Sequence, residues 1–450
     1  MGIDIDFTAC MQGNIGDSGI SQEFIQTAYA NAIEHIDAVK ATFTDDEISF
    51  LNLPVSSDGH QLDKIREFRE QNRGKYEDIV VLGIGGSALA SQMFHTALNH
   101  PAWNLLTQSA RGGDPRFHLV DNIEPELIGT ILDLCTPART LFIVISKSGH
   151  TTETIAIFNI LQQFMQAHFG ETWHSHFVFI TDPLIGWLRS FANQHNIQTF
   201  NIPEKVGGRF SALTPVGLLP AALCGINVEK IIEGAALARE KCFSAKFPQN
   251  WAYSFALIQY LFWTTKHKST QVFMPYANAL KSLSAWFKQL WAESLGKKYN
   301  TSGETIFTGQ TLASAIGTTD QHSQLQLYIE GPNDKIFTFV EVLGFRRDFS
   351  IPQPPAPTSE KINHIHNHTV TEILQAELYA VKKALTELNK PNLSLILPDI
   401  SPETIGELVF GLEFATALVG HFLCINPFNQ PGVEYAKQIT QETLRKSQHS

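Results

Sequence analysis

Cysteine is scarce in this 450-residue chain, and no two cysteines stand at the spacing of a metal site or a redox motif. Small secreted domains that depend on disulfides are shorter and much richer in cysteine. The pattern therefore predicts free thiols in a reducing compartment. The five cysteines are Cys10, Cys135, Cys224, Cys242 and Cys424.

Positive charge is also in short supply. The chain has 33 lysines and arginines against 44 aspartates and glutamates, which gives a net charge of -11 at pH 7. A nucleic-acid binder needs a basic face, so this balance argues against a nucleic-acid partner. An anionic metabolite would need a local group of cations within the acidic background.

Long apolar runs are missing as well. The longest uncharged apolar stretch, residues 213–228, is shorter than the ~20 residues of a membrane span, and it holds two prolines and two glycines. The first six residues are acidic and lack the basic and apolar regions of a secretory signal. We therefore expect a cytoplasmic protein with no membrane partner.

The chain does contain a regular alternation of strand and helix patterns, within an ordinary globular composition. Strands are predicted at 78–82, 117–120, 141–145, 177–180 and 199–202, with helices between them. Such alternation indicates a parallel, doubly wound sheet. The second half repeats it more loosely, with strands predicted at 271–276, 325–329, 336–342 and 393–397. The segments 325–329 and 336–342 alternate like the two strands of a hairpin.

Hydroxyl groups and one lysine gather on the turn that follows the predicted strand 141–145. The sequence Ser-Lys-Ser-Gly-His-Thr-Thr begins at Ser146 and leads into a helix. A strand-to-helix turn aims backbone N–H groups and the positive end of the helix dipole at one point. We expect a phosphate monoester there. Helix capping is the alternative, but a cap needs only one hydroxyl.

A glycine-rich turn, Gly-Ile-Gly-Gly-Ser at 83–87, follows the predicted strand 78–82. Its spacing does not fit the dinucleotide fingerprint, and no P-loop lysine follows it. Glycines of this kind let a ligand lie against the backbone, although many such turns are glycine-rich for packing alone. Because ligands bind at the carboxyl ends of parallel strands, the two turns could line one crevice.

Three further segments contain candidate side chains. Arg209 stands between a glycine pair and an aromatic residue, where it could reach a negative charge or be a surface residue at a hinge. Gln289 and Glu293 are four residues apart and share one face of a predicted helix. His322 closes a segment rich in glycine, serine and threonine. Taken singly, the glutamate would be solvated and the histidine structural.

Together these segments resemble the phosphoglucose isomerase family. The motifs, in the order of the family, are Gly-Ile-Gly-Gly-Ser at 83–87, Ser-Lys-Ser-Gly at 146–149, Gly-Gly-Arg-Phe-Ser at 207–211, Gln-Leu-Trp-Ala-Glu-Ser-Leu-Gly-Lys at 289–297, Gln-His at 321–322 and Gln-Pro-Gly-Val-Glu-…-Lys at 430–437. The length resembles the shorter bacterial form. One departure is His150, where bacterial members usually carry threonine beside the phosphate loop.

The resemblance implies an α/β protein with two SIS domains, each a flavodoxin-like three-layer αβα unit with a parallel sheet. It implies an N-terminal helical segment at 1–75, a first SIS domain at 76–225, a second at 226–428 and a C-terminal helix at 429–450. It further implies a homodimer whose neighbouring chain supplies His322 to the site, and a reaction without a metal or an organic cofactor.

The implied reaction is the interconversion of glucose 6-phosphate and fructose 6-phosphate through an enediol(ate). His322 and Lys437 would open the sugar ring, Glu293 would move the proton between C2 and C1, and Arg209 would stabilise the oxyanion. The expected substrate and phosphate ligands are Gly86, Ser87, Ser146, Lys147, Ser148, Thr151, Gln289 and Gln430. Two alternatives remain: a non-catalytic sugar-phosphate sensor built from SIS domains, and an isomerase that also accepts mannose 6-phosphate.

Overall fold

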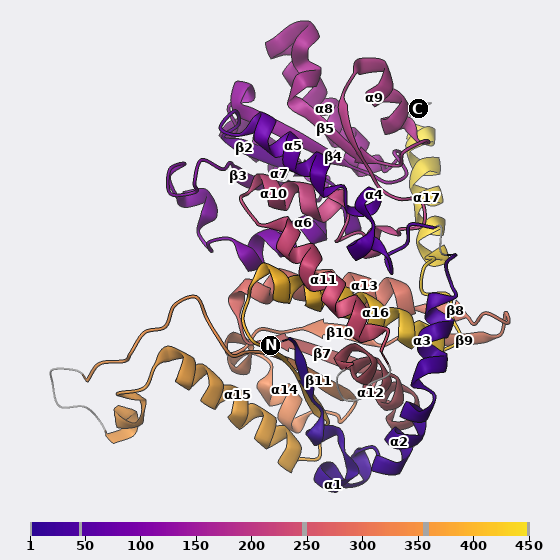
Figure 1. Ribbon diagram of the computed structural model, residues 1–450, viewed down its shortest axis with the longest axis vertical. Coiled ribbons are helices and arrows are strands. Elements are labelled where there is room, and N and C mark those ends of the chain that lie inside the picture. Colours follow the sequence, from indigo (N-terminus) through magenta and orange to yellow (C-terminus); the bar gives the residue numbers. More distant parts are fainter. Residues whose placement is uncertain (1, 45–46, 245–249, 354–359, 448–450) are drawn as a thin grey trace.

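The computed structural model describes residues 2–44, 47–244, 250–353 and 360–447 (Figure 1). Two five-stranded β-sheets lie in opposite halves of the molecule, and a layer of long helices lies between them. This arrangement confirms the predicted α/β fold.

The first sheet contains β2 (Asp78–Leu82), β3 (Arg116–Val120), β4 (Thr140–Ile145), β5 (Phe177–Thr181) and β6 (Gln198–Asn201). Its order is β3-β2-β4-β5-β6, and all pairs are parallel. Counted along the chain, this is the flavodoxin order 2-1-3-4-5, whose direction of winding reverses between β2 and β4. The predicted strands are confirmed to within a residue or two.

Both faces of the first sheet are covered at its centre, which explains why β2, β4 and β5 are buried throughout and largely apolar. Ile79 and Val81 join a cluster with Phe94 of α6 (Gly86–Leu98). Val80 and Leu82 point the opposite way, into a second cluster with side chains of α7 (Pro125–Leu134), α8 (Thr152–Phe169) and α9 (Trp187–His195). The first sheet thus lies between two layers of helices, which is the three-layer arrangement that was predicted.

The second sheet repeats this order with one exception. It contains β7 (Thr270–Pro275), β10 (Thr311–Ser314), β11 (Lys335–Val342) and β12 (Asn392–Leu397), which are parallel to one another. The fifth strand is β1 (Asp4–Asp6), which pairs antiparallel with β12. The predicted parallel sheet is thus confirmed for four strands, whereas the antiparallel edge strand in the N-terminal segment was not predicted. Three residues are too few to give a periodic signal in the sequence.

The predicted hairpin between 325–329 and 336–342 is also wrong. Residues Leu325–Glu330 form the helix α14, whose Tyr328 packs on the ring of Phe337 with centroids 5.1 Å apart. Strand β11 is paired on one side by β7 and on the other by β12, so it has no free edge for a hairpin partner. The alternating apolar pattern of a five-residue segment does not distinguish a short helix from a strand.

The layer between the sheets contains α11 (Val228–Cys242), α13 (Lys281–Leu295) and α16 (Pro402–Phe422), and α12 (Trp251–Lys266) packs beside them (Figure 1). Helix α16 is long and apolar enough to cross a membrane, but 89% of its apolar window is buried inside the protein. One hydrophobic cluster extends from strands of the first sheet through α16 to strands of the second. The sheets therefore share a core, and the predicted domain boundary at 225 stays a prediction.

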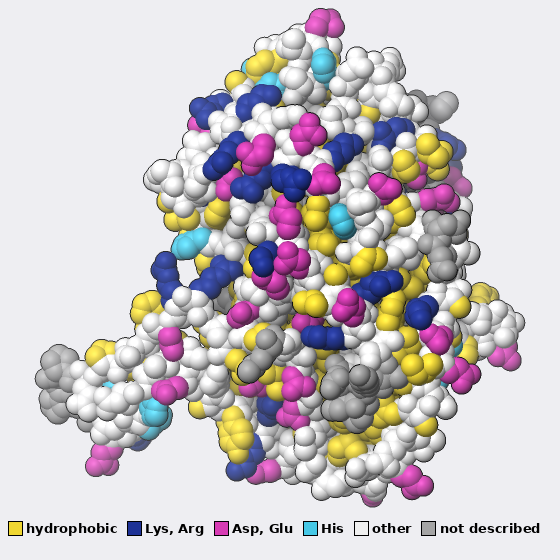
Figure 2. Space-filling view, in the orientation of Figure 1, with side chains coloured by type: hydrophobic (Ala, Val, Ile, Leu, Met, Phe, Trp, Pro, Cys, Tyr) yellow, Lys and Arg dark blue, Asp and Glu magenta, His cyan; other side chains and the backbone are white. Residues whose placement is uncertain are grey.

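The remaining elements surround this frame. They are α1 (Gln12–Ile15), α2 (Gln22–Ala30), α3 (Ala32–Lys40), α4 (Ser57–His60), α5 (Leu62–Asn72), α10 (Pro215–Leu223), β8 (Lys297–Tyr299), β9 (Thr305–Thr308), α15 (Val370–Glu387) and α17 (Pro431–Ser447). Helix α15 projects from the body in Figure 1, and α17 runs along the edge of the body. Acidic and basic side chains are interspersed on the face shown in Figure 2.

Candidate active site

The two predicted ligand turns follow β2 and β4, which are neighbours at the centre of the first sheet. The direction of winding reverses between these strands, and the chain leaves them toward opposite faces of the sheet. A crevice forms at such a point because the two turns diverge. The expectation that both turns lie at one edge of the sheet is therefore confirmed.

The turn after β4 presents its hydroxyl groups at the N-terminus of α8. Ser146 Oγ and Thr151 Oγ1 lie 2.8 Å apart, and Ser148 Oγ accepts a hydrogen bond from His150 N at 3.2 Å. Thr151 is the N-cap residue, yet no side chain caps α8 in the described part of the chain. The first N–H groups of this 18-residue helix are thus left for another acceptor. The capping alternative does not account for these hydroxyls.

Lys147 points away from this turn. Its Nζ donates to the carbonyl oxygens of Glu204 at 2.6 Å and of Val206 at 2.8 Å. These two residues precede the Gly207-Gly208-Arg209 segment, so Lys147 fixes the chain that leads to Arg209. Two backbone carbonyls thus hold the ammonium group of Lys147, and its expected contact with phosphate stays a prediction.

The glycine turn after β2 is packed against two other parts of the site. A Cβ on Gly86 would lie 2.3 Å from the backbone of Gly208, so the missing side chain serves a contact between two loops. Gly85 has a φ of +57°, and a Cβ there would lie 2.8 Å from Gln289 Nε2. The expected approach of a sugar to Gly86 stays a prediction. Ser87 is partly buried in the first turn of α6.

Arg209 lies at the centre of the site, with its side chain only 2% exposed. Its Nη1 lies 3.4 Å from Glu293 Oε2 and donates to Gln430 Oε1 at 2.9 Å. Its Nε donates to Ser294 Oγ at 2.8 Å, and its Nη2 donates to the carbonyls of Pro427 and Asn429. Burial lowers the pKa of Arg209, and the neighbouring Glu293 opposes that change.

Gln289 and Glu293 lie together on α13, as their spacing predicts. Gln289 Nε2 donates to Glu293 Oε1 at 3.1 Å, while the amide oxygen of Gln289 is buried without a partner in the described structure. The Glu293 side chain is 34% exposed, so it is held on one side and open on the other. The site therefore combines the partly exposed carboxylate of Glu293, the buried guanidinium of Arg209 and the unpaired amide oxygen of Gln289.

In the described structure His322 and Lys437 make no hydrogen bond or ion pair with Arg209, Gln289 or Glu293. His322 is exposed at the end of the short helix Thr319–His322, which a 2.7 Å hydrogen bond from Gln321 to Tyr276 ties to the end of β7. Lys437 is exposed on α17 and pairs with Glu434 at 2.8 Å. Their roles in ring opening stay predictions.

One residue of the site was missed. Lys297 was quoted only as the end of a motif, yet its Nζ donates to the carbonyls of Glu293 and Asn429. The available signal was its position four residues after Glu293, where a lysine can reach back to the last carbonyls of a helix.

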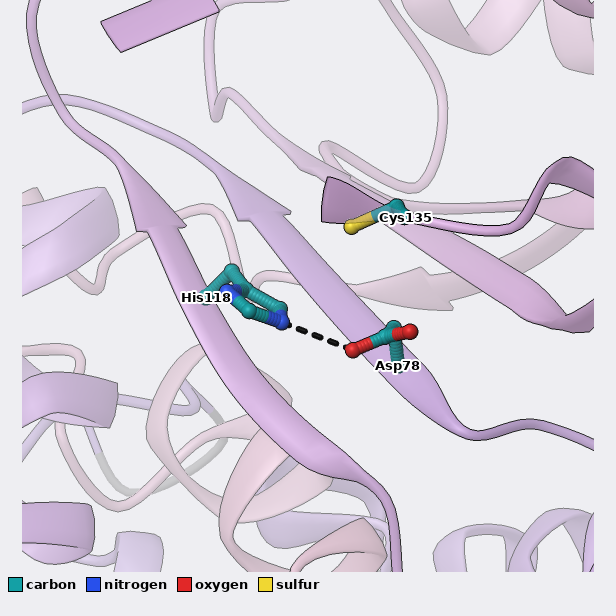
Figure 3. Close-up of side chains that lie close together, drawn as sticks. All are labelled: Asp78, His118 and Cys135. Carbon is teal, nitrogen blue, oxygen red and sulfur yellow. Dashed lines mark hydrogen bonds and ion pairs between the residues drawn. The ribbon is translucent and has the colours of Figure 1, made fainter. Parts of the chain in front are cut away.

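A separate cluster of Asp78, His118 and Cys135 lies at the opposite edge of the first sheet, where β2 begins (Figure 3). Both oxygens of Asp78 accept hydrogen bonds from Arg116 at 2.7 Å, and His118 Nε2 lies 2.7 Å from one of them. Burial raises the pKa of the Cys135 thiol to about 12, so it is no ready metal ligand. The hydrogen bonds from Arg116 and His118 of β3 to the carboxylate of Asp78 therefore join β3 to β2.

Comparisons with known proteins give a consistent result. The chain matches the phosphoglucose isomerase family over residues 60–344 and 357–450. It is 42% identical over 398 residues to the glucose-6-phosphate isomerase of Carboxydothermus hydrogenoformans, which covers 88% of this chain and 85% of that one.

Solved structures show the same similarity. A hypothetical protein from Thermus thermophilus is 34% identical, with a TM-score of 0.85 over 98% of this chain and 99% of that one. A glucose-6-phosphate isomerase from Chlamydia trachomatis has the same fold, with a TM-score of 0.78 at 22% identity over 94% of this chain and 86% of that one.

Proposed function

This chain belongs to the phosphoglucose isomerase family and interconverts glucose 6-phosphate and fructose 6-phosphate; we propose that the cluster around Arg209 and Glu293 carries out the proton transfer. The observation that supports this assignment is the contact of Arg209 with both Glu293 and Gln430, which are 84 and 221 residues away in sequence. Only folding brings these three side chains together.

The phosphate of the substrate binds at the N-terminus of α8. The hydroxyls of Ser146, Ser148 and Thr151 donate to it, and so do the uncapped N–H groups of the helix. Ser87 lies on the adjacent turn and can donate to the same group or to the sugar. Anchoring the phosphate fixes the carbon chain relative to Glu293, which is the positioning that proton transfer requires.

Glu293 is the general base. Its carboxylate removes the proton from C2 of the open-chain aldose, which gives the enediolate, and returns it to C1. Over the same two steps the hydroxyl proton of O2 is lost and O1 gains one, so that the carbonyl moves from C1 to C2. Gln289 fixes one carboxylate oxygen, so the carboxylate does not have to reorganise during the step. General acid–base catalysis of this kind contributes about 10²–10⁴-fold in rate.

Arg209 stabilises the negative charge that develops on the enediolate oxygens. Its guanidinium is already held by Ser294, Gln430 and two backbone carbonyls. The positive charge is therefore in place before the reaction and does not have to move as the enediolate forms. The free oxygen of Gln289 and the amide of Gln430 orient the sugar hydroxyls.

Ring opening is assigned to His322 and Lys437 of a homodimer. Support comes from the surface position of His322 and from two peripheral helices with exposed aromatic side chains, α15 with Tyr379 and α17 with Tyr435. A second copy of the chain would cover these side chains and bring His322 to the neighbouring site. The scarcity of cysteine and its lack of pairing support a cytoplasmic location.

The test is a coupled assay on purified protein, with fructose 6-phosphate supplied, glucose 6-phosphate detected and EDTA present. We expect turnover by the wild type and a loss of about 10²–10⁴-fold in kcat for Glu293→Gln, with substrate Kd within a few-fold by calorimetry. A normal kcat for that variant would remove Glu293 as the base. Binding without turnover by the wild type would indicate a sugar-phosphate sensor, and mannose 6-phosphate in the same assay tests the broader isomerase.

A further inference from the structure

Lys297 is buried directly behind the proposed base. It is the first residue of β8 and follows Gly296, which ends α13. Its side chain is 8% exposed, and its ammonium group donates to the backbone carbonyl of Glu293 and, at 2.8 Å, to that of Asn429. The last carbonyls of a helix have no partner within the helix, so a lysine that reaches them also complements the helix dipole.

The carbonyl of Asn429 also accepts a hydrogen bond from Arg209, at 3.1 Å. Arg209 and Lys297 therefore hold the same segment of chain, which carries Gln430. Arg209 contacts the side chain of Glu293, whereas Lys297 contacts its backbone. The two cations together join the end of α13 to the segment before α17.

We propose that Lys297 is a positioning residue for the isomerisation, which fixes Glu293 against the Gln430 segment and adds a second positive charge beneath the carboxylate. This role rests on Glu293 acting as the base. A displacement of about 1 Å in a catalytic group can cost about 10²-fold in rate, so a restraint on the backbone of Glu293 affects kcat. Both hydrogen bonds of Lys297 go to the segments of Glu293 and Asn429 and none to the phosphate turn, so we expect little effect on KM.

The surroundings of Lys297 make this role dependent on pH. Burial and the positive charge of Arg209 lower the pKa of Lys297 to about 8, although the neighbouring Glu293 acts in the opposite direction. Above that pH the amine loses the charge that strengthens its bonds to the two carbonyls. We therefore expect the kcat of the wild type to decline as pH rises through about 8. An arginine at this position would keep its charge throughout the same range.

The experiment measures kcat and KM from pH 6.5 to 9.5 for the wild type, Lys297→Met, Lys297→Arg and the control Lys298→Met. Lys298 is the exposed neighbour, whose ammonium lies over the ring of Tyr299. We expect Lys297→Met to lose about 10- to 100-fold in kcat with KM within a few-fold. Lys297→Arg should retain activity without the decline near pH 8, and Lys298→Met should match the wild type.

Three results would overturn the proposal: a normal kcat for Lys297→Met, a loss confined to KM, or an alkaline decline that persists in Lys297→Arg. Glu293→Gln is measured alongside. If that variant keeps its kcat, the assignment of the base has failed. If it is inactive while Lys297→Met is active, only the inference about Lys297 has failed.

Discussion

Glu413 gives the sharpest test of the energetics of the core. It lies in the middle of α16, is 0% exposed, and neither carboxyl oxygen has a hydrogen-bond partner in the described part of the chain. Burial raises its pKa well above the usual value of 4.5, so the folded protein holds this carboxyl in its neutral form. The unfolded chain ionises it at an ordinary pH.

The sign of the pH dependence follows from this difference. Below about pH 4.5 both states are protonated, and the contribution of Glu413 to stability is fully present. As pH rises above that value the unfolded state releases a proton and the folded state does not, so stability falls by about 1.4 kcal/mol per pH unit. The fall continues until pH reaches the folded-state pKa.

The perturbation is Glu413→Gln, which keeps the shape of the side chain and cannot ionise. Above pH 6 the unfolding free energy of the wild type should fall with pH relative to the variant, at a slope of up to about 1.4 kcal/mol per pH unit. Urea unfolding at pH 6, 7 and 8 at a fixed protein concentration measures this difference. The control is Glu240→Gln, an exposed glutamate on α11. A difference between wild type and Glu413→Gln that stays constant with pH would refute the reasoning.

Two further predictions concern the site. Ser148→Ala removes one donor to the phosphate, so KM should rise roughly tenfold with a smaller change in kcat, because a hydrogen bond to a charged group is worth about 1.5 kcal/mol or more; steady-state kinetics check this, and a loss in kcat alone would contradict it. Unfolding and refolding His322→Asn and Glu293→Gln together should restore about a quarter of the wild-type activity if sites are shared between subunits, because half of the dimers are mixed and each has one intact site. No recovery in a mixed dimer would place both residues in one chain.

The sequence specified most of the local structure. The three central strands of the first sheet, β2, β4 and β5, are rich in β-branched and aromatic residues, and such runs form buried strands where they are covered on both faces. The turns at 83–87 and 146–149 could be located for the same reason, since they end the two central strands. Gln289 and Glu293 were placed on one face by helical spacing alone.

Other features depended on contacts between distant segments. The three residues of β1 are too few for a strand pattern to be recognised in the sequence. They form a strand because they pair with the open edge of β12. Segment 325–330 does not pair with β11 as a strand, because β7 and β12 already occupy both edges of β11. The segment forms a helix instead. Lys147 was expected at the phosphate, but the nearby carbonyls of Glu204 and Val206 compete for its ammonium group.

The chemical groups of the site, their order along the chain and the family they indicate were thus determined by the sequence itself. Their arrangement was decided only by the tertiary structure, which brings Arg209 against Glu293 and Gln430 and places Lys297 behind them. The reason is physical. Periodicity and turn chemistry act over a few residues, whereas the position of a buried cation depends on which carbonyls and carboxylates folding leaves within reach of it.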